Sequence, residues 1–449
     1  MALIVSVSGI RGIFGSHLTP ENLVTYSAAY GSWLKGGTVV VGRDTRLTGE
    51  ICEEIVTGTL RSTGCDVIRL GVAPTPTVAM EVLRHKAAGG IVLTASHNPE
   101  QWNALKLLNG KSEFLDEKQG SEVLSLAKER NFDWQEYDQT GSVKDVSDAL
   151  QHHIRKILDL PWIDPNVIGK ARFSVAVDAV NGAGSDAIPA LLKALSVKRV
   201  ETIHCTPNGR FPHNPEPLPE HLEDICELVQ ETKCDLGFVT DPDADRLAVV
   251  DENGQVFGEE YTQVAAFDFL LEKTPGDTAT NLSSSRAADD ITERYGKRCH
   301  RSAVGEINVV KAMQNHGAVI GGEGNGGVIL PDLHYGRDAL AGVAMVLQLL
   351  AERKLKASDY RQSLPHYEMS KSKILLEDLG MEAGQVLDKL KSAFQDREPD
   401  TTDGVKIDFE EGWVHFRKSN TEPVVRVYSE AKTAPEAERL AKNVLKAIR

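Results

Sequence analysis

Cysteine is scarce in this sequence, and its spacing forms no metal-binding or redox motif. Six cysteines are scattered over 449 residues, with no Cys-x-x-Cys pair and no histidine at a spacing that suits zinc. We therefore expect reduced thiols in a cytoplasmic protein.

Long apolar runs and an excess of positive charge are also missing. No run approaches the roughly 18 apolar residues of a membrane helix. The opening MALIVSVSGIRG has no basic leader and does not resemble a secretory signal. With 65 acidic and 50 basic residues the formal charge is −15, the wrong sign for a general binder of phosphate backbones. We expect no membrane and no nucleic acid as partners.

The length and the apolar patterning predict several α/β domains. At 449 residues the chain is about three times as long as a usual domain. Short β-rich runs alternate with stretches of helical period, as at 53–62 and 340–353, which is typical of α/β domains with mainly parallel sheets. After Pro365, a predicted helix near 385–394 and a predicted hairpin over 406–419 indicate a domain with a different architecture.

The expected fold class is therefore α/β. We predict three similar mixed-sheet α/β domains over 1–146, 147–253 and 254–365, and a smaller α+β C-terminal domain over 366–449. In each of the first three, polar or glycine-rich residues follow an apolar strand. Ligands bind at the carboxyl ends of parallel strands, so these loops are expected to meet around a central cleft that the fourth domain closes.

Three aspartates in the run DPDADRLAVV directly follow a predicted strand. Asp241, Asp243 and Asp245 would repel one another without a cation, and hard oxygen ligands suit Mg²⁺ or Ca²⁺. An EF-hand would use Glu252 at its twelfth position, but Arg246 stands where that loop needs glycine, and LAVV reads as a strand. A magnesium site is favoured over a solvated acidic turn.

Ser96 lies in TASHNP, directly after the apolar run GGIVL. Taken alone, such a serine is usually a turn residue, because no Gly-x-Ser-x-Gly elbow surrounds it. Together with three aspartates it becomes a candidate nucleophile, since a metal can neutralise a phosphoryl group on its hydroxyl. His97 is either an acid/base group or a loop residue, and Lys106 is either functional or a surface charge.

Two further loops could bind a substrate. GGEGNGG formally matches the dinucleotide-binding pattern Gly-x-Gly-x-x-Gly. However, Pro331 follows and Glu323 would repel a pyrophosphate, so Glu323 and Asn325 fit sugar hydroxyls better.

RKSNTEPVVRV groups cations, hydroxyls and amides as a phosphate cradle does. Its residues are Arg417, Ser419, Asn420, Thr421 and Arg426. Arg11, Arg43 and Arg46 near the N-terminus are phosphate ligands or surface ion pairs.

The four elements TASHNP, DPDADR, GEGNGG and RKSNTEP, in this order, resemble the α-D-phosphohexomutase superfamily of phosphoglucomutases, phosphomannomutases and phosphoglucosamine mutases. The resemblance covers nearly the whole chain. It implies that Ser96 is phosphorylated in the active enzyme and that Mg²⁺ is held by Ser96, Asp241, Asp243 and Asp245.

The resemblance also implies roles for the remaining residues. Arg11 and Arg246 would steady the transferring phosphoryl group, and Lys106 and His97 are acid/base candidates. Glu323 and Asn325 would read the sugar. The non-reacting phosphate would be held by Arg417, Ser419, Asn420, Thr421 and Arg426.

The activity implied is interconversion of hexose 6-phosphate and hexose 1-phosphate, with hexose 1,6-bisphosphate as intermediate and activator. The sugar loop lacks the Ser-Gly-His ending of many bacterial phosphomannomutases, and Val304-Gly305-Glu306 replaces their Thr-Gly-His turn. We therefore favour a phosphoglucosamine mutase, with a phosphomannomutase or phosphoglucomutase as the alternative. A serine phosphatase and a non-catalytic sugar-phosphate-binding protein are the rivals from other classes. The oligomeric state is left open, with a homodimer as one option.

Overall fold

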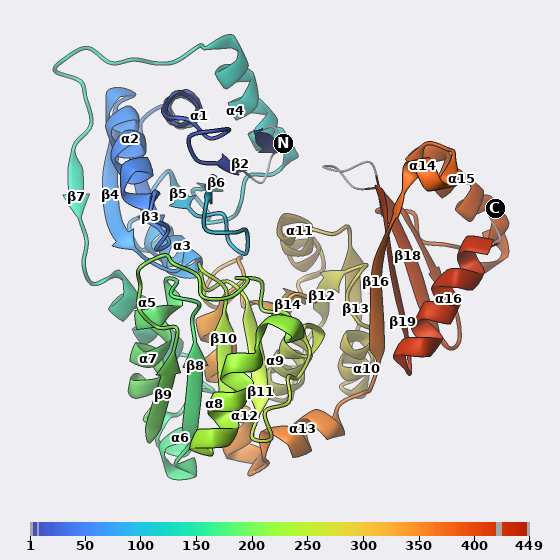
Figure 1. Ribbon diagram of the computed structural model, residues 1–449. Helices are drawn as coiled ribbons and strands as arrows, with labels where there is room; N and C mark the ends of the chain where they lie inside the picture. Colours follow the sequence, from blue (N-terminus) through green and yellow to red (C-terminus); the bar gives the residue numbers. More distant parts are fainter. Residues whose placement is uncertain (1–2, 7–8, 419–423, 447–449) are drawn as a thin grey trace. The chain divides into compact units, whose positions relative to one another are not determined.

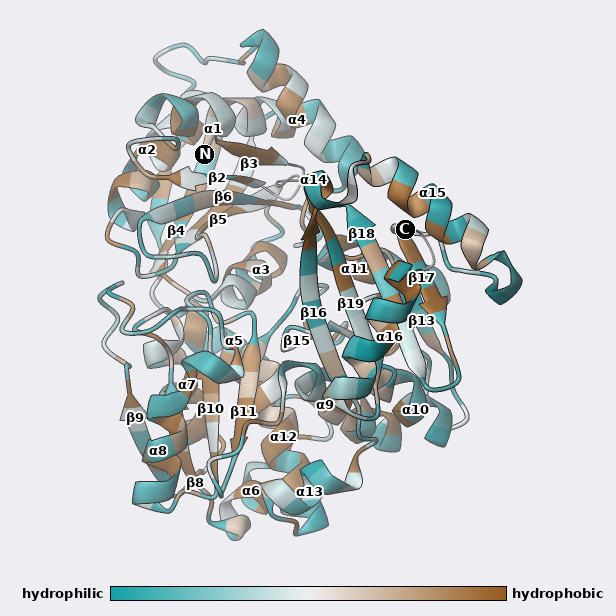
Figure 2. Ribbon diagram, turned by 45° about the vertical axis from the view of Figure 1, so that its right-hand side comes forward, coloured by the Kyte–Doolittle hydropathy of each residue, from teal (hydrophilic) through white to brown (hydrophobic). Residues whose placement is uncertain are grey.

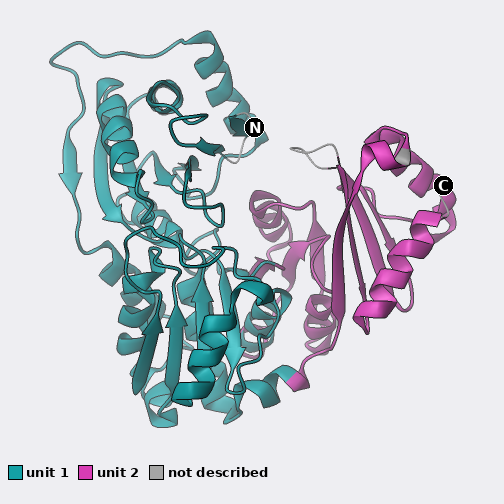
Figure 3. Cartoon of the chain, viewed as in Figure 1, with its two compact units in different colours: residues 1–269, 325–361 teal, residues 270–324, 362–449 magenta. Residues whose placement is uncertain are grey.

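The computed structural model describes residues 3–6, 9–418 and 424–446. The chain forms two compact units (Figure 3). Unit 1 comprises residues 1–269 and 325–361, and unit 2 comprises residues 270–324 and 362–449. Within the described residues, no helix is both long and apolar enough to cross a membrane.

The first sheet of unit 1 has seven strands in the order β1-β2-β6-β5-β3-β4-β7 (Figure 1). The strands are β1 (Ile4–Ser6), β2 (Gly9–Ile13), β3 (Gly37–Arg43), β4 (Cys65–Val72), β5 (Gly89–Leu93), β6 (Trp102–Asn109) and β7 (Val143–Asp145). Strands β5, β3, β4 and β7 run parallel, while β1, β2 and β6 add antiparallel pairs.

Helices cover both faces of this sheet because its strands are apolar on both sides. On one face, α1 (Pro20–Leu34), α2 (Gly49–Ser62) and α4 (Glu117–Glu129) share a core with Val39 and Val41 of β3. On the other, α3 (Thr75–Arg84) packs on Val40. This alternation along β3 follows from the two-residue period of a strand.

The second sheet of unit 1 has the order β11-β10-β8-β9. Its strands are β8 (Ser174–Asp178), β9 (Arg199–Ile203), β10 (Leu236–Thr240) and β11 (Leu247–Asp251). Figure 2 colours β10 and β11 mostly as hydrophobic, in keeping with their buried residues. Other elements of unit 1 are α5 (Ala149–Leu158), α6 (Pro165–Ala171), α7 (Gly184–Ala194), α8 (Glu223–Thr232), β15 (Gly327–Ile329), α12 (Ala339–Arg353) and most of α13 (Ala357–Ser363).

Unit 2 contains a parallel set of strands and an antiparallel sheet. In the parallel set, β12 (Thr278–Asn281) lies between β13 (Cys299–Ser302) and β14 (Ile320–Glu323), with α10 (Ala287–Arg294) and α11 (Glu306–His316). Helix α9 (Glu259–Lys273) begins in unit 1 and ends in unit 2.

The antiparallel sheet has the order β16-β19-β18-β17. Its strands are β16 (Glu368–Leu375), β17 (Val405–Asp408), β18 (Gly412–Lys418) and β19 (Val424–Ala431), accompanied by α14 (Leu376–Leu379), α15 (Ala383–Ala393) and α16 (Ala434–Lys446). Helix α16 buries Ala437, Leu440 and Val444, three or four residues apart, and its outer side is hydrophilic in Figure 2.

The predicted α/β class is confirmed, and several predicted elements lie close to their expected bounds. The helix predicted at 53–62 is the end of α2, and Gly64 adopts the positive φ of 82° that suits a helix terminus. The predicted helix at 340–353 corresponds to α12, and the predicted hairpin to β17 and β18.

Candidate active site

Ser96 follows β5 and has a backbone conformation that is unusual for a residue with a side chain. Its φ is +47°, in the left-handed region, and only 6% of the residue is exposed. Its Oγ donates a hydrogen bond of 2.6 Å to Oδ2 of Asp241. Such strain persists only where the surroundings fix it, as they do in many active sites.

Arg46 fixes the loop that carries Ser96. The guanidinium, whose side chain is 0% exposed, donates to the carbonyl oxygens of Ser96 at 2.5 Å and Asn98 at 2.7 Å. It also donates to Oδ2 of Asp44 at 2.9 Å. Thr94 donates to the same carboxylate at 2.6 Å and accepts from the Ser96 amide at 2.9 Å. Asp44 follows β3 and Ser96 follows β5, and these two strands pair in parallel. The serine loop is therefore held by residues at the neighbouring strand end.

Sequence reasoning left Arg46 open as a surface ion pair, and that alternative is wrong, because the pair with Asp44 is fully buried. Burial raises the pKa of Asp44, and the charge of Arg46 opposes that rise. The sequence GRDTR places Asp44 and Arg46 two positions apart, but it does not indicate that both side chains are buried.

The aspartate loop begins where β10 ends. Oδ1 of Asp241 accepts from the amides of Asp245 and Arg246 at 3.2 Å each, so this carboxylate closes the loop on itself. Ala244 has a φ of +51°. Gly182 lies so close to Pro242 that a Cβ there would lie 2.6 Å from the proline Cα. The backbone packing therefore determines where the three carboxylates point.

The three aspartates are buried together, with one oxygen of each within 4.8 Å of the others. Burial, with the charges of Asp243 and Asp245, raises the pKa of Asp241 well above its ordinary value. One buried oxygen of Asp243 and one of Asp245 accept no hydrogen bond. Unpartnered carboxylate oxygens in an all-oxygen set fit a hard divalent cation such as Mg²⁺.

Neighbouring side chains complete this cluster. Thr75, at the start of α3, donates to Oδ2 of Asp243 at 2.6 Å, and Lys106 on β6 donates to the same oxygen at 2.7 Å. Arg337 donates to Oδ2 of Asp245 at 2.6 Å. Thr75 and Arg337 were missed by the sequence analysis, because neither stands in a local motif.

Lys106 and Arg11 lie on one face of the first sheet. Arg11 on β2 pairs in register with Ala104 on β6, two residues from Lys106. Side chains two apart on a strand share a face, so the two cations are diagonal neighbours. Burial tends to lower the pKa of Lys106, but the charge of Asp243 raises it overall.

His97 and Arg246 flank the serine and the aspartates. Burial, and then the charges of Arg246 and Arg337, lower the pKa of His97 well below its ordinary value. Arg246 donates to Glu216 at 3.3 Å, and its Nε lies 3.9 Å from Oδ1 of Asp245. A neutral imidazole and a guanidinium therefore stand beside Ser96 and the aspartate loop.

The predicted sugar-reading residues fall in different units. Asn325 belongs to unit 1, where its Oδ1 accepts from the Gly327 amide at 3.3 Å and the carbonyl of Gly326 accepts from the amide of Leu247 at 3.0 Å. Glu323 belongs to unit 2 and accepts from Asn281 at 3.1 Å.

Cations line one row of the antiparallel sheet in unit 2. Arg417 on β18 pairs in register with Arg426 on β19, which pairs with Lys373 on β16. Arg417 also donates to Asp403 at 2.8 Å. Like charges directly opposite one another are unfavourable unless an anion lies near them. Lys373 was missed by the sequence analysis, whereas Ser419, Asn420 and Thr421 lie outside the described residues.

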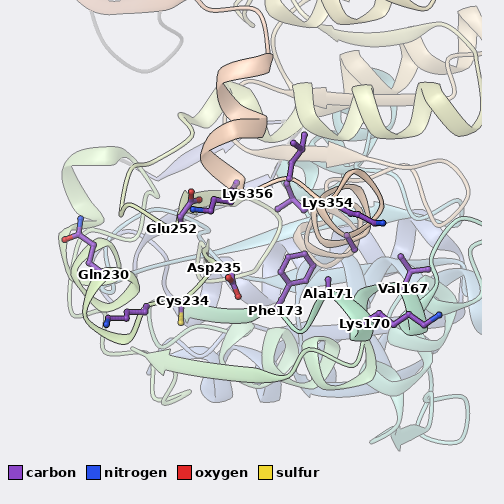
Figure 4. A pocket seen from close by; sticks show the side chains of 15 residues that line it. Val167, Lys170, Ala171, Phe173, Gln230, Cys234, Asp235, Glu252, Lys354 and Lys356 are labelled. Atoms are coloured by element: carbon purple, nitrogen blue, oxygen red, sulfur yellow. The ribbon is translucent and has the colours of Figure 1, made fainter.

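A cavity of about 700 Å³ lies elsewhere in unit 1 (Figure 4). Its lining includes Phe173 and Asp235, which precede β8 and β10, whereas Asp241 follows β10. Five-residue strands separate these ends by about 16 Å. The cavity is therefore distinct from the serine and aspartate site.

Four matches to known families cover most of the chain. They are phosphoglucomutase/phosphomannomutase, alpha/beta/alpha domain I, over residues 3–133; domain II over 151–254; domain III over 258–367; and the C-terminal domain over 375–447. These are the domains of the α-D-phosphohexomutases. The chain belongs to the phosphoglucomutase/phosphomannomutase family and is a phosphohexomutase.

Individual relatives extend over the whole length. A phosphoglucomutase/phosphomannomutase of Thermococcus kodakarensis is 36% identical over 446 residues, covering 97% of this chain and 96% of the relative. A phosphoglucosamine mutase of Methanococcus maripaludis is 31% identical, covering 97% and 96%. The crystal structure of a phosphoglucomutase/phosphomannomutase family protein from Burkholderia thailandensis matches with a TM-score of 0.86 and 27% identity, covering 99% and 97%.

Proposed function

We propose that this phosphohexomutase interconverts glucosamine 6-phosphate and glucosamine 1-phosphate through a phosphorylated Ser96. The observation that carries the role of Ser96 is its position. Its Oγ lies 2.6 Å from Asp241 in a strained, buried loop beside three carboxylates and Lys106. A turn serine in solvent would need none of these partners.

Ser96, Asp241, Asp243 and Asp245 would hold Mg²⁺, as the unpartnered carboxylate oxygens favour. When bound, the ion would neutralise charge on the transferring phosphoryl group. The chain's own cations are proposed to supply the remaining charge: Lys106 and Arg246 lie beside the aspartates, and Arg11 is a diagonal neighbour of Lys106 on the sheet. Arg337 and Thr75 hold Asp245 and Asp243 in position.

The proposed transfer exchanges one phosphorus–oxygen bond for another. The bond between Oγ of Ser96 and phosphorus breaks while a hydroxyl oxygen of the hexose monophosphate bonds to phosphorus, giving a hexose 1,6-bisphosphate. Lys106, which is protonated beside Asp243, is proposed to give a proton to Oγ and to regain one from the attacking hydroxyl, so that the hydroxyl proton is in effect transferred to Oγ. The reverse transfer, from the other end of the sugar, restores phosphoserine and releases the isomer.

The phosphate that does not react needs a separate site. We assign it to Arg417 and Arg426, with Lys373 in the same cross-strand row. Ser419, Asn420 and Thr421, which follow β18 in the sequence, are proposed to complete it. Charge-assisted hydrogen bonds from guanidinium groups suit a phosphate dianion. Glu323 and Asn325 are proposed to contact the sugar hydroxyls.

The choice of glucosamine rests on acidic residues and on relatives. Glu306 begins α11, and Glu323 ends β14 in the same unit; these charges favour a cationic amino-sugar over a neutral hexose. The Methanococcus relative is named a phosphoglucosamine mutase. The Thermococcus relative, named a phosphoglucomutase/phosphomannomutase, supports the alternative that mannose and glucose phosphates are substrates.

A side-by-side assay decides between these substrates. Purified protein with Mg²⁺ and hexose 1,6-bisphosphate would be given the 6-phosphates of glucosamine, glucose and mannose, and kcat/KM would be measured for each. The highest value for glucosamine 6-phosphate is expected, and a strong preference for a neutral hexose would reject the proposal. Inorganic phosphate release without isomer formation would instead indicate a phosphatase.

A further inference from the structure

Two histidines and an aspartate form a second cluster in unit 1, which shares no residue with the serine and aspartate site. Asp178 ends β8, and His204 directly follows β9, its parallel neighbour. His213 lies in the loop that leads on from His204. Nδ1 of His204 lies 2.9 Å and Nε2 of His213 lies 3.1 Å from Oδ2 of Asp178. The carboxylate is 1% exposed, while both imidazoles reach solvent.

The outer nitrogens of both imidazoles already face acceptors. Nδ1 of His213 lies 2.8 Å from the carbonyl oxygen of Asn214. Nε2 of His204 lies 3.5 Å from Oδ2 of Asp224. A ring that donates its outer N–H presents a lone pair on the inner nitrogen. Metal-binding histidines are usually oriented in this way, by a carbonyl or a carboxylate behind the ring.

The distances from the two imidazole nitrogens to the oxygen of Asp178 suit a small divalent ion. Zinc binds nitrogen and oxygen at about 2.0 to 2.2 Å, which places tetrahedral ligands roughly 3.3 Å apart. The two nitrogen–oxygen distances are within a few tenths of an ångström of that separation. One ligand atom of each residue lies within 4.8 Å of the others. Two imidazoles and a carboxylate favour zinc over magnesium, which prefers oxygen.

We propose that Asp178, His204 and His213 bind a zinc ion, with one coordination position left for water. The remaining oxygen of Asp178 accepts from the amide of Val180 at 2.8 Å, which keeps the carboxylate in place. This site is independent of the proposed substrate and of the magnesium ligands.

The proposed zinc ion would tie the 204–218 loop to the end of β8. That loop carries Glu216, which pairs with Arg246 at 3.3 Å, and Phe211, whose ring lies 5.0 Å from the guanidinium of Arg46. The ion would therefore have a structural role, holding a loop that contacts two arginines of the active site.

The rival explanation is an ion pair without a metal. Burial tends to lower the pKa of His213, but its hydrogen bond to Asp178 raises that pKa overall. A doubly protonated His213 could donate to both Asp178 and Asn214. The experiment must therefore detect the metal itself rather than the stability of the loop.

Cobalt is a suitable probe, because Co²⁺ replaces Zn²⁺ and absorbs visible light strongly only in tetrahedral sites. Metal-free protein would be saturated with Mg²⁺ to fill the oxygen site and then titrated with Co²⁺ alone. Asp178→Asn and His213→Gln remove ligands. His221→Gln is the matched control, since this histidine lies just beyond the loop and its Nδ1 lies 2.9 Å from the carbonyl oxygen of Glu216 rather than from Asp178.

One equivalent of Co²⁺ with intense visible bands, displaced by Zn²⁺, is expected for the wild type and for His221→Gln. Both ligand variants should lose the bands while keeping the wild-type circular dichroism spectrum. If His213→Gln does not fold, His204→Gln takes its place. A wild type without these bands, or bands of equal strength in Asp178→Asn, would overturn the zinc site in favour of the ion pair.

Discussion

Oγ of Ser96 donates a hydrogen bond of 2.6 Å to Oδ2 of Asp241, although 145 positions separate the two residues in the chain. The contact joins the end of β5 to the end of β10, two strands of different sheets. Each loop is held by its own buried contacts, Arg46 for the serine and Gly182 for the aspartates. The proposed nucleophile and metal ligands therefore meet through packing.

Replacing the proposed nucleophile should abolish turnover without unfolding the protein. Ser96→Ala is expected to lower kcat at least about a thousand-fold, as removal of a nucleophile does in other enzymes. Intact-mass spectrometry should find one phosphoryl group on the wild type and none on the variant. Ser112→Ala, at another serine with positive φ, is the control and should keep its activity. A phosphorylated Ser96→Ala protein would place the phosphoryl group on another residue.

Magnesium should stabilise the fold as well as support activity. The buried aspartates repel one another, so a cation that binds only the folded state raises the melting temperature. At a concentration 100 times the dissociation constant the gain is about 2.7 kcal/mol. Asp243→Asn should lose most of this gain in a thermal-shift titration, whereas Asp235→Asn, at the other end of β10, should keep it. Equal shifts in both variants would contradict the assigned ligands.

Truncation of Arg417 should weaken substrate binding more than it slows the chemistry. A charge-assisted hydrogen bond contributes about 1.5 to 3 kcal/mol, so Arg417→Ala is expected to raise KM roughly 10- to 150-fold. Arg439→Ala on the exposed side of α16 is the matched control in the same unit. Steady-state kinetics that give the same KM for both variants would remove Arg417 from the phosphate site.

Breaking the buried pair of Arg46 and Asp44 should destabilise unit 1. Arg46→Met leaves a buried carboxylate without its partner and removes the donors to the serine loop, at a cost of about 3 to 5 kcal/mol. Guanidinium chloride unfolding measures this loss. Arg46→Lys keeps the charge but not the forked geometry, so it should recover part of the stability and little of the kcat. Full kcat in Arg46→Lys would show that the fork does not position Ser96.

The buried imidazole of His415 should make unit 2 sensitive to acid. Burial lowers the pKa of His415 from 6.5 to about 4, and the Nε2 of this residue lies 2.6 Å from the carbonyl of Asp403. Because the unfolded chain takes up the proton first, stability falls as the pH drops from 6.5 towards 4, by about 3 kcal/mol in total.

His415→Gln cannot take up that proton, so its free energy of unfolding should fall less over the same pH range. The test compares free energies of unfolding for the two proteins at pH 7 and pH 4.5. An equal loss in both would assign the acid sensitivity to other groups.

The spacing of apolar residues was enough to predict those helices and strands whose buried residues are apolar. Helix α12 buries thirteen residues, among them Leu340, Val343 and Leu347, and was predicted to within one residue at its start. Helix α1 was not predicted, because its buried side consists largely of small residues such as Ser27, Ala28 and Gly31, which give a weak helical period.

Short motifs also determined which chemistry to expect. DPDADR and TASHNP have local spacing that limits what their side chains can bind, so the proposed metal ligands and the proposed nucleophile were identified from the sequence. Tertiary structure alone decided that Arg46 is buried, that Arg337 reaches Asp245, and that His204 and His213 share Asp178. These contacts join residues from separate loops and helix ends, and their distances depend on how strands and helices pack, which no local spacing records.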